Sequence, residues 1–455
     1  MCGISRYGWK CWLVGWLPGL VVAAAAAQAP SLTLRETIDR ALARNPQIAR
    51  TQAEAVEADA GVAMARTALL PRLNFTEDLS RGNDPVYVFG ARLRQQRFAQ
   101  SDFSLDSLNR PPPTGNFATR FSGEWMLFNG FETQQQIRAA RLGAASATAM
   151  SAAVDQGVVF QVVQAYQGEL YAQRQLEVAQ HEQQTAEALL HDAQTRVKAG
   201  LAIDSDLLGA EVNMSARQQE TIAAQGAVDT AWAELEEAMG STMDVRPALR
   251  PLQVKSYAEG SLAEDIATAL RARPDKKALA ELTAARDHAV NAARSDFFPQ
   301  VSAYGNWEID RATFAGYGGN NWVAGAQLNL DILPLGKRAR FQQAKAARDE
   351  AAAQEHLQEQ QIRLAVSRAF SDHQTAERMV ATAQAAMQQS SESLRILRNR
   401  YDAGLATMTD LLRAEDAQRQ SQNDYWHAAY GNMVAYASLL YATGQLTPDS
   451  AENLQ

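Results

Sequence analysis

Two stretches of the chain are nearly the same: RVKAGLAIDSDLLGAE at residues 196–211 and RYDAGLATMTDLLRAE at residues 400–415. The match extends without gaps from 196–240 onto 400–444, with 17 of 45 positions identical. A second ungapped match joins 38–73 to 266–301. Agreement at fixed offsets indicates a tandem duplication of a unit of about 210 residues, which is too long for a solenoid repeat.

The sequence of each half predicts the same order of secondary-structure elements. A helix at 35–69 or 262–297 comes first, and Pro71 or Pro299 ends it because proline cannot continue a helix. Two short segments of period two follow, and then a very long helix at 132–198 or 337–401. A glycine turn at Gly200 or Gly404 leads into a helix that returns to Gly240 or Gly444.

The long helices exceed the diameter of a compact domain. At ~1.5 Å per residue, each spans ~100 Å. Both are rich in Ala, Gln and Glu, with apolar residues at helical spacing, and small alanines allow the close packing of a coiled coil. An ordinary helical bundle is the alternative, and the absence of proline from Glu132 to Val245 counts against it.

Four segments alternate as strands do: 72–80, 117–127, 300–309 and 322–332. In 322–332, Trp322, Leu328 and Ile332 share one face, while Asn321 and Asp331 share the other. Such alternation suits a transmembrane β-barrel with lipid outside, and it suits a soluble half-buried sheet equally well. A barrel in lipid must close, and known barrels start at eight strands. Four strands per chain therefore predict an oligomer if the protein spans a membrane.

The N-terminus has the pattern of a secretory signal peptide over residues 1–29. Arg6 and Lys10 precede an apolar run, and alanines follow at 23–27. The run is interrupted and shorter than the ~20 residues of a spanning helix, which disfavours a transmembrane anchor. Cleavage would remove Cys2 and Cys11, leaving a mature chain without disulfides or thiolate metal sites.

Composition excludes several functions. Removing Arg6 and Lys10 takes the formal net charge from −8 to −10, and such an acidic chain does not suit nucleic acid. The six histidines show no metal-ligand spacing, and no phosphate-binding loop or nucleophile elbow occurs. We therefore expect no enzyme activity, no metal and no cofactor.

The duplicated order of helices and strands, together with the AGLA turn and the DLLxAE sequence after it, resembles the TolC-like outer membrane efflux protein family. The resemblance covers about 32–446 and includes FNG at 128–130, LLPRL at 69–73 and FFPQV at 297–301. It implies a mainly α fold with a small β part. In this fold a long α-helical coiled-coil barrel continues into a transmembrane β-barrel, with four strands per protomer and twelve in a homotrimer.

The resemblance also implies a location, partners and boundaries. The protein would lie in the outer membrane among its lipids and extend into the periplasm. There it would meet a periplasmic adaptor and an inner-membrane pump of the RND, ABC or MFS type. The expected parts are a first repeat at 30–240, an equatorial linker at 241–261, a second repeat at 262–446 and a tail at 447–455. The segment 81–116, with three prolines at 111–113, is expected as an extended extracellular loop.

By the same resemblance, the two glycine turns form the periplasmic tip and its gate. Gly200, Leu201, Gly404 and Leu405 would dock the adaptor. The remaining tip residues would form the gate and lock of the channel: Asp206, Asp410, Tyr401, Asp204, Asp402 and Arg413. Three copies of Asp410 would form a negative ring that favours cations.

The lock departs from the family pattern at two positions. Ala406 and Arg413 stand where some members carry an arginine and an aspartate, so Asp204, Asp402 or Arg413 would take over the lock. An aspartate after a turn is also a common helix cap, which is the alternative for Asp206 and Asp410.

The expected function is the outer-membrane channel of a tripartite efflux or type I secretion system. Such a channel is a passive conduit for small molecules or proteins. The alternative is a soluble periplasmic coiled-coil scaffold or adaptor without a pore.

Overall fold

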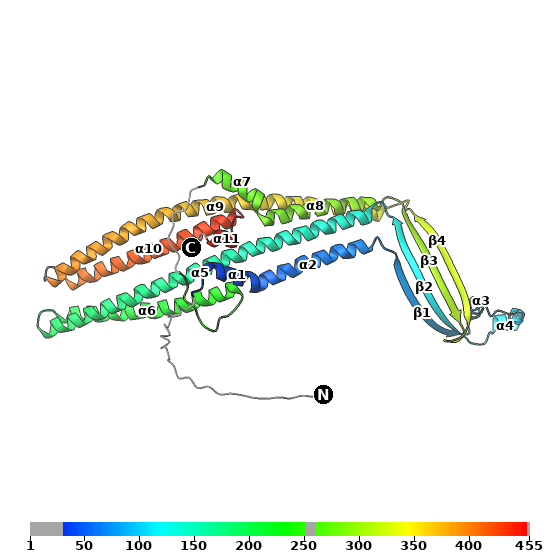
Figure 1. The fold of residues 1–455 in the computed structure, drawn as a ribbon, viewed down its shortest axis with the longest axis horizontal. Helices are drawn as coiled ribbons and strands as arrows, with labels where there is room; N and C mark the ends of the chain where they lie inside the picture. The colour runs from blue at the N-terminus through cyan, green and yellow to red at the C-terminus, as the bar shows by residue number, and fades with distance from the viewer. Residues whose placement is uncertain (1–30, 251–259, 453–455) are drawn as a thin grey trace, which may run out of the picture.

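The computed structural model describes residues 31–250 and 260–452. The predicted signal peptide, 1–29, lies outside the described residues, as do 251–259 of the expected linker and 453–455 of the tail. The described chain is a long helical bundle with one four-stranded sheet at its end (Figure 1). This confirms the predicted class, mainly α with a small β part.

The two halves repeat the same elements in the same order. The first half contains α1 (Leu34–Arg44), α2 (Pro46–Thr67), β1 (Arg72–Gly82), β2 (Thr114–Phe128), α5 (Glu132–Lys198) and α6 (Asp204–Met239). The second half contains α7 (Leu262–Ala272), α8 (Pro274–Ser295), β3 (Gln300–Arg311), β4 (Gly318–Asn329), α9 (Leu335–Asp402) and α10 (Met408–Ala442). The short helix α11 (Pro448–Glu452) follows.

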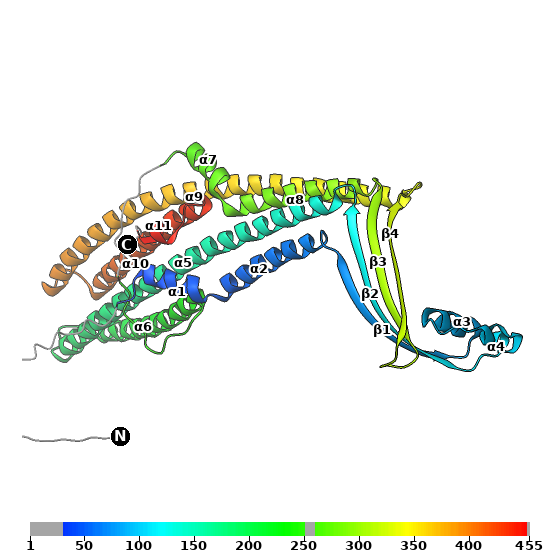
Figure 2. The same cartoon turned by 45° about the vertical axis from the view of Figure 1, so that its right-hand side comes forward.

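The long helices α5 and α9 have 67 and 68 residues, so each is ~100 Å long. The first matches the predicted 132–198, and the second extends the predicted 337–401 by a few residues. Towards one end of the molecule, α6 packs along α5 and α10 packs along α9. Towards the sheet, α2 packs along α5, and α8 packs along both α5 and α9 (Figures 1 and 2). Among the described residues, no helix combines the length and hydropathy that crossing a membrane requires.

The prediction of one continuous helix at 35–69 and at 262–297 was wrong. Asn45 and Arg273 have extended backbones, with ψ of 126° and 124°, and each separates two helices. The reason is the proline that follows, Pro46 or Pro274, which disfavours a helical conformation in the residue before it and starts the next helix at its first position.

The prediction that 81–116 is an extended loop was also wrong, whereas its extracellular location stays a prediction. This segment contains α3 (Pro85–Arg94), the 3₁₀ helix η1 (Gln100–Phe103) and α4 (Leu105–Asn109). Asp84 and Ser104 cap α3 and α4 by accepting backbone N–H hydrogen bonds. A smaller error concerns β4, which ends at Asn329 rather than at residue 332.

The sheet is antiparallel throughout, in the order β1-β2-β3-β4. Its register places Phe75, Phe121, Trp307 and Trp322 in one row across all four strands. Pro71 and Pro299 lie directly before β1 and β3, where the chain leaves α2 and α8 for the sheet.

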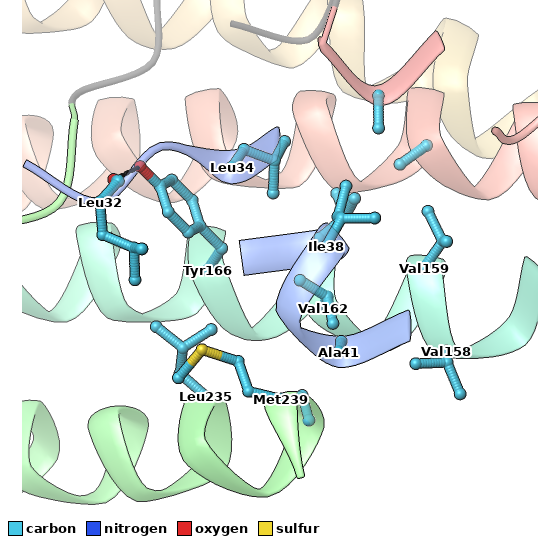
Figure 3. Packing of buried hydrophobic residues seen from close by; sticks show 14 of the residues in the cluster. Leu32, Leu34, Ile38, Ala41, Val158, Val159, Val162, Tyr166, Leu235 and Met239 are labelled. Carbon is cyan, nitrogen blue, oxygen red and sulfur yellow. Dashed lines mark hydrogen bonds between the residues drawn. The ribbon is translucent and has the colours of Figure 1, made fainter. Parts of the chain in front are cut away.

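The main apolar core lies in the middle of the molecule, far from the sheet. There α1 crosses α5 and α6 and buries Leu34 and Ile38 against Val162 and Leu235 (Figure 3). The hydroxyl of the buried Tyr166 is 2.9 Å from the carbonyl oxygens of Leu32 and Arg250. This contact attaches the segments that flank the first repeat to the long helix.

Candidate functional site

One face of the sheet is apolar and exposed. The ring centroids of Phe75 and Phe121 are 5.1 Å apart, and those of Phe121 and Trp307 are 5.6 Å apart. Phe75 is 62% exposed and Trp322 is 76% exposed. A continuous apolar surface of this kind marks an interaction with lipid or with another apolar surface.

The opposite face of the sheet is polar and better covered. Arg120 forms an ion pair with Glu308 at 3.2 Å, and the amide of Asn116 donates to a carboxylate oxygen of Asp310 at 2.7 Å. Glu308 and Asp310 are both buried. A soluble half-buried sheet would cover its apolar face instead, so the arrangement favours lipid on the apolar side and water on the polar side.

Both edges of the sheet are open. No strand within the described ranges pairs with the outer edge of β1 or of β4. Because the four strands alternate in direction, β4 of one copy can continue the antiparallel pattern with β1 of the next. In lipid, an apolar sheet with unpaired edges would leave backbone N–H and C=O groups without hydrogen-bond partners.

The opposite end of the molecule is formed by two helical hairpins. The turn between α5 and α6 contains Gly200, and the turn between α9 and α10 contains Gly404, with φ of 73° and 74°. Each glycine is followed by an exposed leucine, Leu201 or Leu405. The left-handed backbone explains the glycine at both positions, since side chains rarely adopt it.

Tyr401 lies at this tip between the two hairpins. The guanidinium of Arg196 stands over its ring at 4.8 Å, and the same arginine pairs with Asp192 at 2.7 Å and with Asp402 at 3.8 Å. Burial raises the pKa of the Tyr401 hydroxyl, so it stays protonated. A groove of about 380 Å³ runs beside these residues and is lined by Asp192, Tyr401 and Asp402.

Asp410 takes part in the cap of α10. One of its carboxylate oxygens accepts hydrogen bonds from the Thr407 hydroxyl at 2.7 Å and from the Thr407 backbone N–H at 3.2 Å. These bonds lower the pKa of Asp410. The capping role that the sequence left open is therefore present at this position.

The other predicted gate residues differ in their surroundings. Asp206 has the equivalent position in α6, where Ile203 precedes the helix and offers no side-chain cap. The negative charge of Asp206 contributes to raising the pKa of Tyr401, which lies in the other hairpin. Asp204 and Arg413 are exposed and form no ion pair within the described part of the chain, whereas Asp402 is brought to Arg196.

The two halves of the chain each match a known family model. The model for outer membrane efflux proteins matches residues 37–241 and again residues 266–445. The chain belongs to the outer membrane efflux protein family.

Individual relatives in this family resemble the chain over nearly its whole length. The outer membrane efflux protein BepC of Brucella suis is 24% identical over 437 residues, which cover 95% of this chain and 89% of BepC. The alkaline protease secretion protein AprF of Pseudomonas aeruginosa is 22% identical over 444 residues, covering 95% of this chain and 89% of AprF. The crystal structure of a membrane protein from Pseudomonas aeruginosa has a TM-score of 0.78 at 23% identity and covers 91% of both chains.

The most connected side chain at the tip of this efflux protein, Arg196, is not among the predicted gate residues. The sequence did contain a signal for Arg196, because Arg196 and Arg400 are the matching first residues of the two duplicated stretches. Asp192 lies one turn before Arg196 on α5, whereas Tyr401 and Asp402 belong to α9, about 200 positions away, and only the packing of the hairpins brings them to Arg196.

A second set of ion pairs joins the hairpins further from the tip. Arg217 of α6 pairs with Asp416 of α10 at 3.0 Å, and Arg419 of α10 pairs with Glu220 of α6 at 3.7 Å. Sequence patterns did not indicate this crossed contact. It joins α6 to α10 through charges that are partly exposed to water.

Two buried acids lie beside these ion pairs. Burial raises the pKa of Glu182 in α5 and of Glu415 in α10. Arg398 contacts Glu415 at 2.9 Å and opposes that rise. Within residues 31–250 and 260–452, no group of three or more His, Cys, Asp or Glu side chains is arranged to hold a metal ion.

Proposed function

We propose that this protein is one subunit of a homotrimeric outer-membrane channel for the export of small molecules or proteins. The observation that carries the proposal is the sheet, whose apolar face is exposed and whose two edges are unpaired. Three copies supply twelve strands for a closed barrel. The helices attached to it, ~100 Å long, extend the conduit through the periplasm.

The parts of the chain have separate roles in this proposal. Residues 1–29 direct secretion and are removed. The repeats at 30–240 and 262–446 build the conduit, the linker at 241–261 lies on its equator, and 447–455 form a tail. The polar face of the sheet, with Arg120 and Glu308, lines the water-filled lumen.

The tip turns are the proposed docking site for a periplasmic adaptor. Leu201 and Leu405 project there with 79% and 69% of their surface exposed, which suits an apolar contact with another protein. The energy for export comes from an inner-membrane pump of the RND, ABC or MFS type that the adaptor connects. The channel itself is a passive conduit.

The tip residues are the proposed gate. Arg196, stacked on Tyr401 and paired with Asp402, holds the two hairpins together, and Asp206 adds its charge beside Tyr401. Asp204 and Arg413 lie nearby on the exposed surface, and one carboxylate oxygen of Asp410 is left to contribute to a negative ring. Arg196→Ala should raise single-channel conductance, whereas Arg395→Ala, which removes a pair within α9 only, should not.

Planar-bilayer recording of the purified protein tests the main proposal. We expect stepwise conductance, together with heat-modifiable migration of the protein from an outer-membrane fraction. A protein that stays in the soluble periplasmic fraction and forms no pore would instead be a coiled-coil scaffold. That result would end the channel proposal.

A further inference from the structure

The helical segment between β1 and β2 is attached to the polar face of the sheet. Gln95, at the C-terminal end of α3, is buried, and its side-chain amide donates to the Asn116 side-chain oxygen at 2.8 Å and to the Gly115 carbonyl at 2.9 Å. The Arg311 carbonyl lies 3.4 Å from the same nitrogen. One side chain therefore connects the segment to both central strands.

The backbone of α3 also reaches β4. The Asn321 amide donates to the Arg94 carbonyl at 3.1 Å. A Cβ atom at Gly319 would lie 1.8 Å from that same carbonyl oxygen, so only glycine allows the approach. The C-terminal end of α3 thus lies across the polar side of the sheet, from β2 to β4. It contacts the strands at their ends farthest from the long helices (Figure 2).

The segment has tertiary contacts of its own. The Tyr87 hydroxyl donates to the Ser80 hydroxyl at 3.0 Å, and Arg92 of α3 forms an ion pair with Asp102 of η1. The rings of Phe89, Phe98 and Phe103 pack edge to face, with centroids 4.7 and 5.1 Å apart. These contacts give the segment a fixed shape and a fixed place.

We propose that residues 83–113 form a folded constriction across the outer mouth of the lumen and limit the size of the molecules that leave it. This inference rests on the proposed function, because it takes the polar face as the lumen wall. In a closed ring every copy brings its own segment to the same level. The exit is then narrowed by protein that Gln95 holds in place.

Engineered cysteines can test this proposal from the outside of the cell. Ser122 lies on the polar face six residues along β2 from Asn116, about 20 Å deeper at 3.3 Å per residue. Tyr317, in the turn between β3 and β4, is fully exposed at the same outer end. Ser122→Cys and Tyr317→Cys are treated on intact cells with a small charged maleimide and with the same maleimide on a long polyethylene glycol. The chain without an engineered cysteine is the blank.

We expect Tyr317→Cys to react with both reagents. Ser122→Cys should react with the small reagent and about ten-fold more slowly with the large one, because the constriction sets the pore diameter. Adding Gln95→Glu should remove that difference. Glutamate has the shape of glutamine, yet it places a carboxylate against the three acceptor oxygens that the amide now contacts.

The matched control is Gln100→Glu, the same change at an exposed position of the same segment. It should leave the size limit unchanged. Replacing 85–112 by a short glycine-serine loop is the second way to open the mouth. Equal rates for both reagents at Ser122→Cys in the intact protein would overturn the constriction while leaving the channel proposal standing. If Ser122→Cys stays unlabelled by the small reagent even after residues 85–112 are replaced, while Tyr317→Cys reacts, the polar face is not a lumen, and the proposed function fails with it.

Discussion

Thr407 and Ile203 stand at the same place in the two duplicated turns, each directly before a helix. Only Thr407 caps its helix, by accepting the backbone N–H of Asp410 at 3.2 Å. Thr407→Ala should lower the free energy of unfolding by about 1 kcal/mol, the usual loss for an N-cap. Ile203→Thr should stabilise α6 by supplying the missing cap. Thermal unfolding of the purified oligomer measures both, and an equal loss for the two variants would contradict the capping explanation.

A buried acid makes the stability of the helical hairpins depend on pH. Burial is the largest cause of the raised pKa of Glu182, so the folded protein binds this proton more tightly than the unfolded chain. The stabilising effect of that proton is fully present below the ordinary glutamate pKa of about 4.3 and is lost as the pH rises through the raised value. Glu182→Gln should therefore raise the melting temperature at pH 7 to 8, and the gain should shrink towards pH 4. If the gain in melting temperature instead grew on acidification, the pKa of Glu182 would be lowered by folding rather than raised.

At the scale of elements, two glycines near the tip should respond in opposite ways to alanine. Gly404 has φ of 74° and Gly209 lies inside α6, and a Cβ atom at either would have nothing within 4 Å. The space available to an added methyl group is therefore the same at both positions, and only the backbone conformation differs. Gly404→Ala should cost about 1–2 kcal/mol because the left-handed conformation strains an L-residue. Gly209→Ala should stabilise by about 0.5–1 kcal/mol, since alanine loses less entropy in a helix. Urea unfolding of both variants compares them directly.

The sequence determined the long elements well because their signals are local. Proline and glycine at fixed positions bounded α5 and α9, and strict alternation placed β2 and β3. Pro46 and Pro274 were visible too, but a run of helical residues on both sides hid the break. Contacts such as Arg196 on Tyr401 or Gln95 on Asn116 could not be predicted, because they depend on how separate elements pack and leave no periodic trace. The proposed gate and the proposed constriction at the outer mouth both depend on contacts of this second kind.

For the whole molecule, the face on which a residue lies should matter more than its hydropathy. Trp322 and Val323 are neighbours in β4, are 76% and 51% exposed, and point to the apolar and the polar face respectively. Trp322→Lys places a charge in lipid, which costs about 2–4 kcal/mol near the bilayer midplane, and should reduce the amount of assembled protein in the outer membrane. Val323→Lys places the same charge in the lumen, so the protein should assemble and its conductance should shift away from cations. Heat-modifiable migration measures assembly, and bilayer recording measures selectivity. Equal loss of assembly for both variants would mean that the two faces do not meet lipid and water, and the closed ring of copies would lose its physical basis.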